Sequence, residues 1–372
     1  VLFLCGWYPS KILPNNGDFI QRHAEAVSLN HTVKVIHIIT DRAAKKNIDY
    51  SSEQINGIET HTAYLRHYNN PIKKIVVFIK AFKVLLKRCG PIDIVHLNEI
   101  FPFGVFSLYL KWFRKKPYII SEHFTGYHYP QSENIRFLQK FISSIITKKA
   151  SFVCPVSNDL KKSMQKLGLQ GNYCRIPNVV DTTVFLPTNT TPTIFTITHI
   201  SSMVNDHKNI EGIIRFIKKL EPIIDDFKFK FIGKDAEMYI PFAKKLGVNL
   251  EKVIFIDHLP HKEIATNLQE SNLFVLFSNY ENLPCVILEA FSCGTPVVST
   301  NVGGINEFFP ENFGFLIDTK DEDALLHKTI EVYTNFKTNK EKMHQYVEKN
   351  FSTVSIANQF SELYYSALNE SI

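Results

Sequence analysis

The sequence lacks several features that would assign it to other classes of protein. Its longest apolar runs, 75–86 and 101–113, contain lysines or break at Pro102 and Gly104, so neither supplies the ~20 apolar residues of a membrane-spanning helix. The chain also has no low-complexity tract. Its first residues, VLFLCGWYP, lack a basic segment and a cleavage site of small residues, which predicts a buried first strand instead of a signal peptide.

Cysteines are few and show no pattern typical of a metal site. The six of them form no CxxC pair, and Cys5 and Cys154 lie inside apolar runs typical of strands. We therefore expect reduced, packed thiols in a cytosolic protein.

Acidic residues are scarce in the first half of the chain. Residues 1–180 hold 25 Lys and Arg against 11 Asp and Glu, whereas residues 181–372 hold 17 against 25. The net charges of the two halves are therefore +14 and −8, which agrees with the total of +6. A basic half can face nucleic acid, an anionic membrane or a phosphorylated substrate, and composition alone leaves these three open.

Strand-like and helix-like segments alternate along the whole chain. This alternation predicts an α/β fold with parallel sheets. A polar, proline-bounded stretch at 187–193 reads as a linker, and a length of 372 residues suits two domains. The chain therefore predicts two doubly wound domains, with ligands at the carboxyl ends of the strands and a cleft between the domains as the binding site.

Two glutamates, Glu281 and Glu289, flank the start of a predicted helix. Asn282 is placed to cap this helix, Pro284 suits its first turn and Gly294 ends it. The residues around Glu289 are apolar, so its carboxylate lies among core residues and needs a partner. A sugar nucleotide fits this arrangement: Glu289 would bind ribose hydroxyls, the helix N–H groups the diphosphate, and Glu281 the sugar. The alternative is a capped surface helix with two solvated glutamates.

The same stretch, followed by the strand 296–299 and by 302–307, resembles the family 4 glycosyltransferases, a retaining group with the GT-B fold. The resemblance covers nearly the whole chain. Its other segments are the first loop (6–9 and 16–19), a strand end with a histidine (121–123), the interdomain segment (175–181), a strand end that lines the base pocket (232–234) and the terminal helix after 351–352.

The resemblance implies a domain organisation and a set of site residues. It implies two Rossmann-like doubly wound domains that face each other across a cleft, at 1–184 and 185–352, and a helix at 353–372 that crosses back to the first domain. It implies catalytic roles for His123 and Glu281. The donor-binding residues it implies are Gly17, Ser202, Lys208, Gly233, Asn282, Leu283, Pro284 and Glu289.

Two positions depart from the family pattern. Asp18 follows Gly17 where the family often has a second glycine, and its side chain could crowd or repel a diphosphate. Ser202 stands where the family usually has an arginine, so Lys208 and backbone N–H groups would hold the phosphates without a bidentate clamp.

Three motifs have competing interpretations. Asp321-Glu322-Asp323 has the form of a metal-binding DxD, but it opens a predicted helix, where acidic residues act as caps, and we expect no metal. His123 alone could be a core histidine; beside Glu122 at a strand end it is a candidate for catalysis. The basic amphipathic segments 73–88 and 109–116 are either outer helices with solvated lysines or a docking surface for an anionic membrane, and no motif accompanies them that would indicate nucleic acid binding.

These observations predict a retaining glycosyltransferase that uses a nucleotide-diphosphate sugar and needs no cofactor. Its acceptor would be a glycan or a lipid-linked saccharide, in cell-surface polysaccharide synthesis, and it would work in the cytoplasm, at times on the inner membrane face. The alternatives are a GT-B-like nucleotide-sugar isomerase and a non-catalytic sugar-nucleotide-binding subunit. The sequence leaves the sugar, the nucleobase and the linkage open.

Overall fold

The computed structural model describes residues 1–189 and 192–370, which divide into two compact units. Unit 1 comprises Val1–Val179 and Thr353–Ile372, and unit 2 comprises Val180–Ser352. The first division thus falls after Val179, where the sequence predicts a boundary after residue 184. Residues 190–191 of the predicted linker lie outside the described part of the chain.

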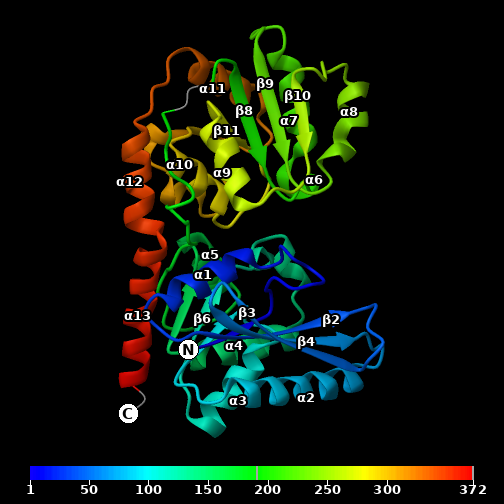
Figure 1. Cartoon of the computed structure of the whole chain (residues 1–372), viewed down its shortest axis with the longest axis vertical. Helices are drawn as coiled ribbons and strands as arrows, with labels where there is room; N and C mark the ends of the chain where they lie inside the picture. The colour runs from blue at the N-terminus through cyan, green and yellow to red at the C-terminus, as the bar shows by residue number, and fades with distance from the viewer. Residues whose placement is uncertain (190–191, 371–372) are drawn as a thin grey trace. The chain divides into compact units, whose positions relative to one another are not determined.

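Unit 1 is built on a seven-stranded sheet with the strand order β3-β4-β2-β1-β5-β6-β7 (Figure 1). Six of its strands run parallel, and β3 pairs antiparallel with β4. The strands are β1 (Leu2–Cys5), β2 (Lys34–Asp41), β3 (Ile48–Ile55), β4 (Ile58–Arg66), β5 (Val95–Asn98), β6 (Tyr118–Glu122) and β7 (Phe152–Pro155).

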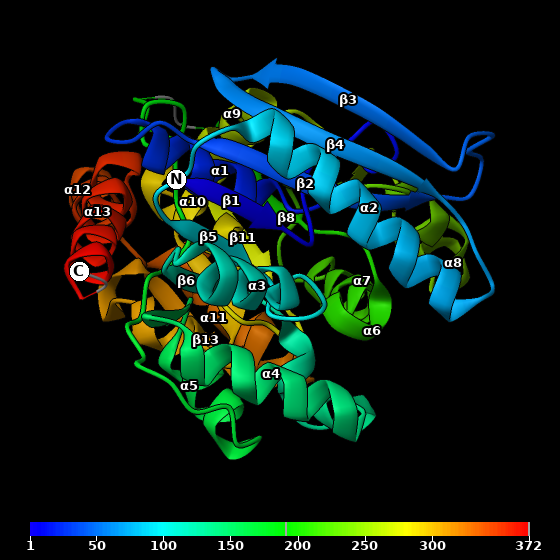
Figure 2. The same cartoon turned by 90° about the horizontal axis from the view of Figure 1, so that it is seen from below.

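The helices of unit 1 cover both faces of this sheet. The connections β4 to β5, β5 to β6 and β6 to β7 all proceed in the same direction across the sheet, so right-handed crossovers place their helices on one face, in a row that Figure 2 shows. The connection β1 to β2 proceeds in the opposite direction and places its helix on the other face. The helices are α1 (Asp18–Ser28), α2 (Pro71–Cys89), α3 (Gly104–Arg114), α4 (Phe137–Lys149), α5 (Asn158–Lys166) and α13 (Thr353–Asn369), with 3₁₀ turns at Thr125–Tyr127 and Gln131–Asn134.

The hairpin β3–β4 is a correction to the sequence analysis, which places no strand there and expects parallel pairing. Asn56 and Gly57 join the two strands, and both have positive φ values, 49° and 79°. A two-residue turn of this kind matches the twist of a hairpin. The pattern of β3 is weak because this strand is half exposed and mostly polar.

Unit 2 has a six-stranded sheet, parallel throughout, with the order β10-β9-β8-β11-β12-β13. The sequence analysis does not predict the edge strand β13, because four residues that begin with a glycine give little hydrophobic periodicity. The strands are β8 (Phe195–Ile200), β9 (Phe227–Ile232), β10 (Val253–Ile256), β11 (Leu273–Leu276), β12 (Val297–Thr300) and β13 (Gly314–Ile317).

Cap residues mark where several helices of unit 2 begin or end. Side chains of Asp321 and Asn339 accept hydrogen bonds from the first turns of α11 and α12, and Gly294 ends α10 with a left-handed φ of 76°. The helices are α6 (Asn205–Lys208), α7 (Ile210–Leu220), α8 (Ile240–Lys245), α9 (His261–Gln269), α10 (Cys285–Cys293), α11 (Glu322–Thr334) and α12 (Lys340–Phe351), with 3₁₀ turns at Ala236–Tyr239, Ile305–Phe308 and Glu311–Phe313.

The last helix, α13, completes the core of unit 1, as the sequence predicts. Its buried face, which includes Ile356 and Phe360, packs with α1 and the sheet, and the Tyr364 hydroxyl lies 2.6 Å from Nδ1 of His96 on β5. The six cysteines, all within the described residues, carry free thiols. No helix among residues 1–189 and 192–370 is long and apolar enough to cross a membrane.

Candidate active site

The strand orders indicate where each unit binds its ligand. In a doubly wound sheet, a crevice opens at the carboxyl edge where the order reverses, because neighbouring loops diverge to opposite faces. In unit 1 this point lies between β1 and β5, and in unit 2 between β8 and β11. Most residues that the sequence predicts as functional follow these strands or a neighbouring one.

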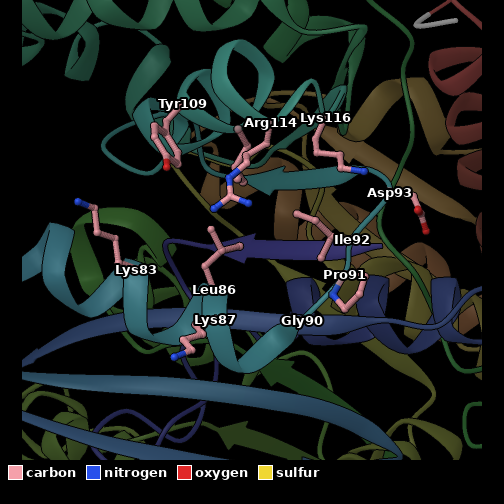
Figure 3. Close-up of a pocket in the computed structure, with 11 residues that line it drawn as sticks. Lys83, Leu86, Lys87, Gly90, Pro91, Ile92, Asp93, Tyr109, Arg114 and Lys116 are labelled. Atoms are coloured by element: carbon pink, nitrogen blue, oxygen red, sulfur yellow. The ribbon is translucent and has the colours of Figure 1, made fainter.

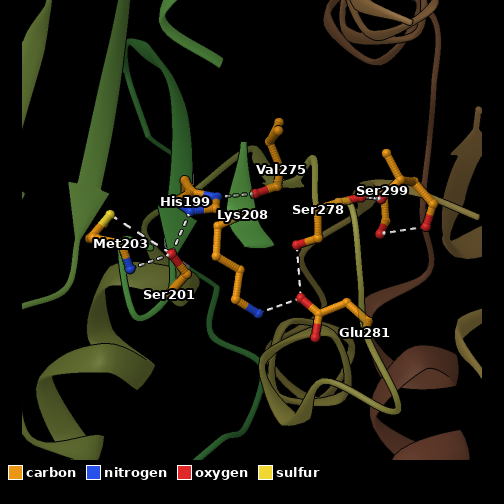
Figure 4. A network of polar contacts seen from close by, with 9 residues as sticks. His199, Ser201, Met203, Lys208, Val275, Ser278, Glu281 and Ser299 are labelled. Carbon is orange, nitrogen blue, oxygen red and sulfur yellow. Dashed lines mark hydrogen bonds and ion pairs between the residues drawn. The ribbon is translucent and has the colours of Figure 1, made fainter. Parts of the chain in front are cut away.

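In unit 2 an ion pair joins the loops after β8 and β11. Lys208, the last residue of α6, donates to Oε1 of Glu281, which lies in the loop between β11 and α10 (Figure 4). Ser278 donates to the same oxygen at 2.8 Å. Glu281 is buried and Lys208 is largely so, which makes the pair far less screened than a surface salt bridge. The structure thus brings together two predicted site residues that are 73 positions apart.

Backbone contacts fix this ion pair in place. The N–H of Asn279 donates to the carbonyl of His207 at 2.7 Å, which ties the loop after β11 to α6. Gly303, with a φ of 59°, lies so close to the backbone of Glu281 that a Cβ would overlap the Glu281 carbonyl. The N–H of Gly304 donates to the carbonyl of Asn282 at 2.8 Å. The two glycines therefore hold the chain around Glu281 in one conformation.

The helix that follows, α10, differs from the prediction at its start. It begins at Cys285 with Pro284 at the N-cap, and no side chain caps it. Asn282 is therefore not the cap; its side chain and that of Leu283 are buried in the loop before the helix. Pro284 occupies the cap because its fixed φ suits an extended residue before the first turn. Glu289 lies in the middle of α10 and is buried, as the apolar sequence around it predicts.

The end of β8 holds the remaining predicted donor residues. Ser202 is exposed, and the neighbouring Ser201 receives a hydrogen bond from the Met203 N–H at 3.1 Å. Gly233, at the end of β9, packs against the Ser201 carbonyl so closely that a Cβ would overlap it. His199 lies beneath this loop, where burial lowers the pKa of its imidazole to about 4, so it is a neutral structural residue.

In unit 1 the loop after β1 leads into α1 through Gly17. This residue has a φ of 74°, and a Cβ there would lie 2.7 Å from the Trp7 carbonyl carbon, so no other residue fits without strain. Asp18 is the first residue of α1, where a carboxylate favours the helix dipole, and it pairs with Arg22 at 3.4 Å. Asp18 is thus engaged with its own helix.

His123 follows β6 and lies between aromatic rings. Its centroid is 4.6 Å from that of Phe19 and 5.2 Å from that of His23, both on α1. Burial, and then the nearby His23, hold the pKa of His123 well below its usual range, whereas a side-chain hydrogen bond to Asn178 raises it. His123 is therefore neutral at physiological pH and suited to hydrogen bonding with a sugar hydroxyl.

Glu122 has a structural role. Its carboxylate accepts hydrogen bonds from the N–H groups of Ile100, His123 and Phe124 at 2.9–3.0 Å, and it is fully buried. These bonds lower its pKa, but desolvation is the larger effect, and the net result is a raised pKa. Glu122 connects the ends of β5 and β6 and sets the backbone on which His123 stands.

Glu99 is a candidate that sequence reasoning missed. It follows β5 directly, at the point where the strand order reverses, and its φ of 74° is unusual for a residue other than glycine. Its carboxyl lies against Gly6, after β1, where any Cβ would overlap it. Burial, and the neighbouring Glu122, raise the pKa of Glu99 to about 8. A polar residue directly after an apolar strand was the signal available in the sequence.

The DxD segment has the structural role that its position at a helix start predicts. It caps α11 through Asp321, which accepts a hydrogen bond from the Ala324 N–H at 2.8 Å. Glu322 and Asp323 both pair with Lys219, and Glu322 also pairs with Arg215. Residues 1–189 and 192–370 contain no cluster of three or more His, Cys, Asp or Glu side chains that could hold a metal ion.

Two protein-family models match this chain. The model of glycosyl transferases group 1 matches residues 189–350, and the model of Glycosyltransferase Family 4 matches residues 22–184. Together they cover most of both units. The fold is the GT-B fold, and the chain belongs to the group 1, family 4 glycosyltransferases, a retaining family of enzymes.

Individual relatives agree with this assignment. The chain is 22% identical over 360 residues to the putative teichuronic acid biosynthesis glycosyltransferase TuaC of Bacillus subtilis, with 87% of each protein covered. It is 28% identical over 223 residues to one polypeptide of the phosphatidylinositol N-acetylglucosaminyltransferase of Arabidopsis thaliana, covering 58% of this chain. That alignment spans about half, 49%, of the Arabidopsis protein.

Among solved structures, Anabaena HepE in complex with UDP superposes with a TM-score of 0.73. The superposition covers 98% of this chain and 99% of HepE, at 16% sequence identity. At that identity the likeness concerns the fold.

Proposed function

We propose that this protein transfers a sugar from a nucleoside diphosphate donor to a hydroxyl group of a glycan or lipid-linked saccharide, with retention of the anomeric configuration. The observation that carries the proposal is the buried Lys208–Glu281 pair at the switch point of unit 2, beside the start of α10. It places a cation, a carboxylate and the positive end of a helix dipole within one site, which suits a diphosphate joined to a sugar.

The donor would be held mainly by unit 2. Glu289 would accept hydrogen bonds from the ribose, and the first N–H groups of α10 would bind the diphosphate. Lys208 would then interact with both Glu281 and a phosphate oxygen. It would thereby replace the arginine that the family usually has at the position of Ser202. The binding of UDP by HepE supports a uridine nucleotide as the first donor class to examine.

The acceptor would be bound by unit 1, near Gly17, His123 and Glu99. Neutral groups such as the imidazole of His123 bind hydroxyls without competing for the donor phosphates. The leaving diphosphate, held by Lys208 and helix N–H groups, would depart while the acceptor attacks from the same face, and this electrostatic support would provide much of the rate.

The site of action would be the cytoplasm and the inner face of a membrane. Unit 1 carries the basic segments 73–88 and 109–116, and TuaC is named for teichuronic acid biosynthesis. We therefore place the protein in cell-surface polysaccharide synthesis, with a peripheral attachment through unit 1. A nucleotide-sugar isomerase or a binding subunit is not favoured, because the named relatives are transferases.

Donor binding and transfer can be tested separately. Sugar nucleotides are first screened by thermal shift, because a ligand that binds only the folded state raises the melting temperature. The stabilising donor is then supplied with its sugar labelled, with and without membrane lipid extract. Label should appear in an acceptor fraction only when acceptor is present. Epimerised sugar without acceptor would indicate an isomerase, and binding without turnover a silent subunit.

A further inference from the structure

A second pocket lies in unit 1, between α2 and α3, at the amino edge of the sheet. It has a volume of about 600 Å³. Ile92 and Asp93 line it just before β5, and Lys116 lines it just before β6. Glu99 and His123 lie at the other ends of β5 and β6, so this pocket is distinct from the candidate active site.

Positive charge dominates the lining of this pocket. Four cations, Lys83, Lys87, Arg114 and Lys116, face a single acid, Asp93. None of the four side chains has a hydrogen bond or ion pair with another residue of the described chain. Lys111 on α3 differs, because its ammonium donates to the carbonyl of Lys149 at 2.6 Å.

Some of the lining side chains extend into the space between the two helices. Figure 3 shows Arg114 and Tyr109 pointing from α3 toward α2, and Lys83 extending from α2 toward α3. Leu86 and Ile92 form an apolar floor below them. A guanidinium, an ammonium and a phenolic hydroxyl around an apolar floor suit a phosphate attached to an apolar body.

The two helices that line the pocket, and α4, which packs against α3, carry no acidic residue. α2 has six Lys and Arg, α3 two and α4 three, and none has Asp or Glu. An ordinary outer helix layer mixes both signs of charge. The pocket therefore lies within a predominantly positive surface, which favours a polyanionic partner such as an anionic lipid bilayer.

Exposed apolar side chains lie on the same two helices. Along α2, Ile72, Val76 and Ile79 recur at helical spacing, and the stripe continues to Lys83 in the pocket; Ile72 is 72% exposed. On α3, Phe113 is also 72% exposed, and its ring packs against Tyr109 at 5.3 Å. Apolar residues beside unpaired cations are typical of surfaces that enter the headgroup region of a membrane.

We propose that the α2–α3 pocket binds the phosphate of an anionic lipid headgroup and prefers a phosphomonoester, while the neighbouring apolar residues enter the bilayer interface. The proposal rests on the peripheral attachment proposed above and adds a specific headgroup site to it. Arg114 and Lys83 bind the phosphate oxygens, and Tyr109 donates a hydrogen bond. A monoester carries a charge of about −1.5 to −2 near pH 7, so two cations in one pocket favour it over a singly charged diester.

Vesicle flotation distinguishes a site from a diffuse attraction. Phosphatidylcholine vesicles containing phosphatidic acid are compared with vesicles containing phosphatidylglycerol, adjusted to the same zeta potential. The wild-type protein should bind the phosphatidic acid vesicles about fivefold more tightly, the effect expected for roughly one additional charge contact. Equal binding to both would overturn the headgroup site, and binding to neither would overturn the membrane attachment itself.

Two double variants with equal loss of charge localise the effect. Lys83→Gln with Arg114→Gln removes two of the four pocket cations, whereas Lys74→Gln with Lys80→Gln removes two exposed cations of α2 outside the pocket. The first pair should abolish the preference for phosphatidic acid, and the second should weaken binding to both vesicles equally and preserve the preference. Identical behaviour of the two pairs would overturn the proposal.

Competition with a soluble phosphomonoester distinguishes a lipid headgroup from a soluble phosphate as the ligand. Glycerol 3-phosphate should compete with phosphatidic acid vesicles only at concentrations far above those of the lipid, because it lacks the apolar contacts. Competition at equal concentration would identify the site as one for a soluble phosphate and would overturn the lipid assignment. Melting temperatures of both variants, and their binding of a sugar nucleotide by unit 2, should equal those of the wild type, which separates this result from any failure of the transferase proposal.

Discussion

The two sheets present different chemistry at the points where their strand order reverses. In unit 2, Lys208 and Glu281 form an ion pair, and the amino-terminal end of α10 adds positive potential. In unit 1, His123 is held neutral, and Glu99 has a pKa of about 8, so both are largely uncharged near neutral pH. The same topology therefore supports an ionic site for a charged donor in one unit and a hydrogen-bonding site for neutral hydroxyls in the other.

Substitution of Glu281 should have the largest effect on this contrast. Glu281→Gln removes the partner of Lys208 and the proposed contact to the sugar, so turnover at saturating donor should fall by about 100-fold or more. Affinity for the bare nucleoside diphosphate should stay within about twofold, because that fragment lacks the sugar. Steady-state kinetics and titration calorimetry provide the two measurements, with Glu237→Gln on the surface as control. An unchanged turnover number would remove Glu281 from the mechanism.

Substitution of Glu289 should affect donor binding instead. Glu289→Ala removes the proposed ribose contact, and the affinity for the bare nucleoside diphosphate should fall by about 10- to 100-fold, or about 1.4–2.8 kcal/mol. Calorimetry with UDP tests this, and the melting temperature of the unliganded variant shows whether the fold is intact. If a well-folded variant bound UDP as the wild type does, the ribose assignment would be wrong.

Substitution of Glu99 should change stability and activity in opposite directions. Its folded pKa of about 8 lies above the ordinary value of 4.5, so its stabilising effect is full below pH 4.5 and is lost as the pH rises to 8. Glu99→Gln cannot ionise, so it avoids this loss of stability at high pH. After allowance for the partial exposure of Glu99, the variant's free energy of unfolding should exceed that of the wild type by about 1–2 kcal/mol at pH 8 and should equal it at pH 4.

The activity of the same variant should decline. Its KM for the acceptor should rise about tenfold, since roughly 1.4 kcal/mol of hydrogen bonding is lost, while donor affinity stays constant. Urea unfolding at the two pH values and acceptor titrations measure both effects, with the exposed Glu53→Gln as control. If the variant were more stable and its KM for the acceptor were unchanged, Glu99 would have no role in acceptor binding and would only strain the fold.

Chelation should have the smallest effect. Lys208 and the helix N–H groups are proposed to neutralise the leaving diphosphate, so EDTA should change turnover by less than about 20%. A catalytic metal stabilises the transition state by several kcal/mol, so its removal would lower turnover far more. Loss of activity in EDTA, restored by Mg²⁺ or Mn²⁺, would contradict this and would return attention to Asp321 and Asp323.

The sequence was sufficient for much of the fold and for less of the site. Most of the parallel strands could be predicted because they are short apolar runs, as the fully buried β1 and β11 are. The parallel strands β4 and β13 were not predicted. The helix α2 could be predicted because Asn70 and Pro71 mark its start. The hairpin β3–β4 could not be seen from apolar periodicity, although Asn56-Gly57 is a turn signal in its own right. Asn282 failed as a cap because the chain stays extended through Pro284, where tertiary contacts to Gly304 fix the loop.

Within the site, motif and geometry contributed differently. The spacing of Glu281 and Glu289 indicated a candidate donor segment, but the pairing of Glu281 with Lys208 depends on two loops that only the folded sheet brings together. Glu99 belongs to no motif. Its importance comes from the reversal of strand order beside Gly6, which is a property of the topology and not of the local sequence.

The return of α13 to unit 1 also has a consequence for how the chain is made. Ile356, Phe360 and Tyr364 complete the core beneath β1 and β5, yet the ribosome synthesises them after the whole of unit 2. Unit 2 is continuous in sequence, so all of its core residues are synthesised before α13. Unit 1, although synthesised first, must wait with an open apolar surface, so the nascent chain should depend on chaperones longest in its amino-terminal half.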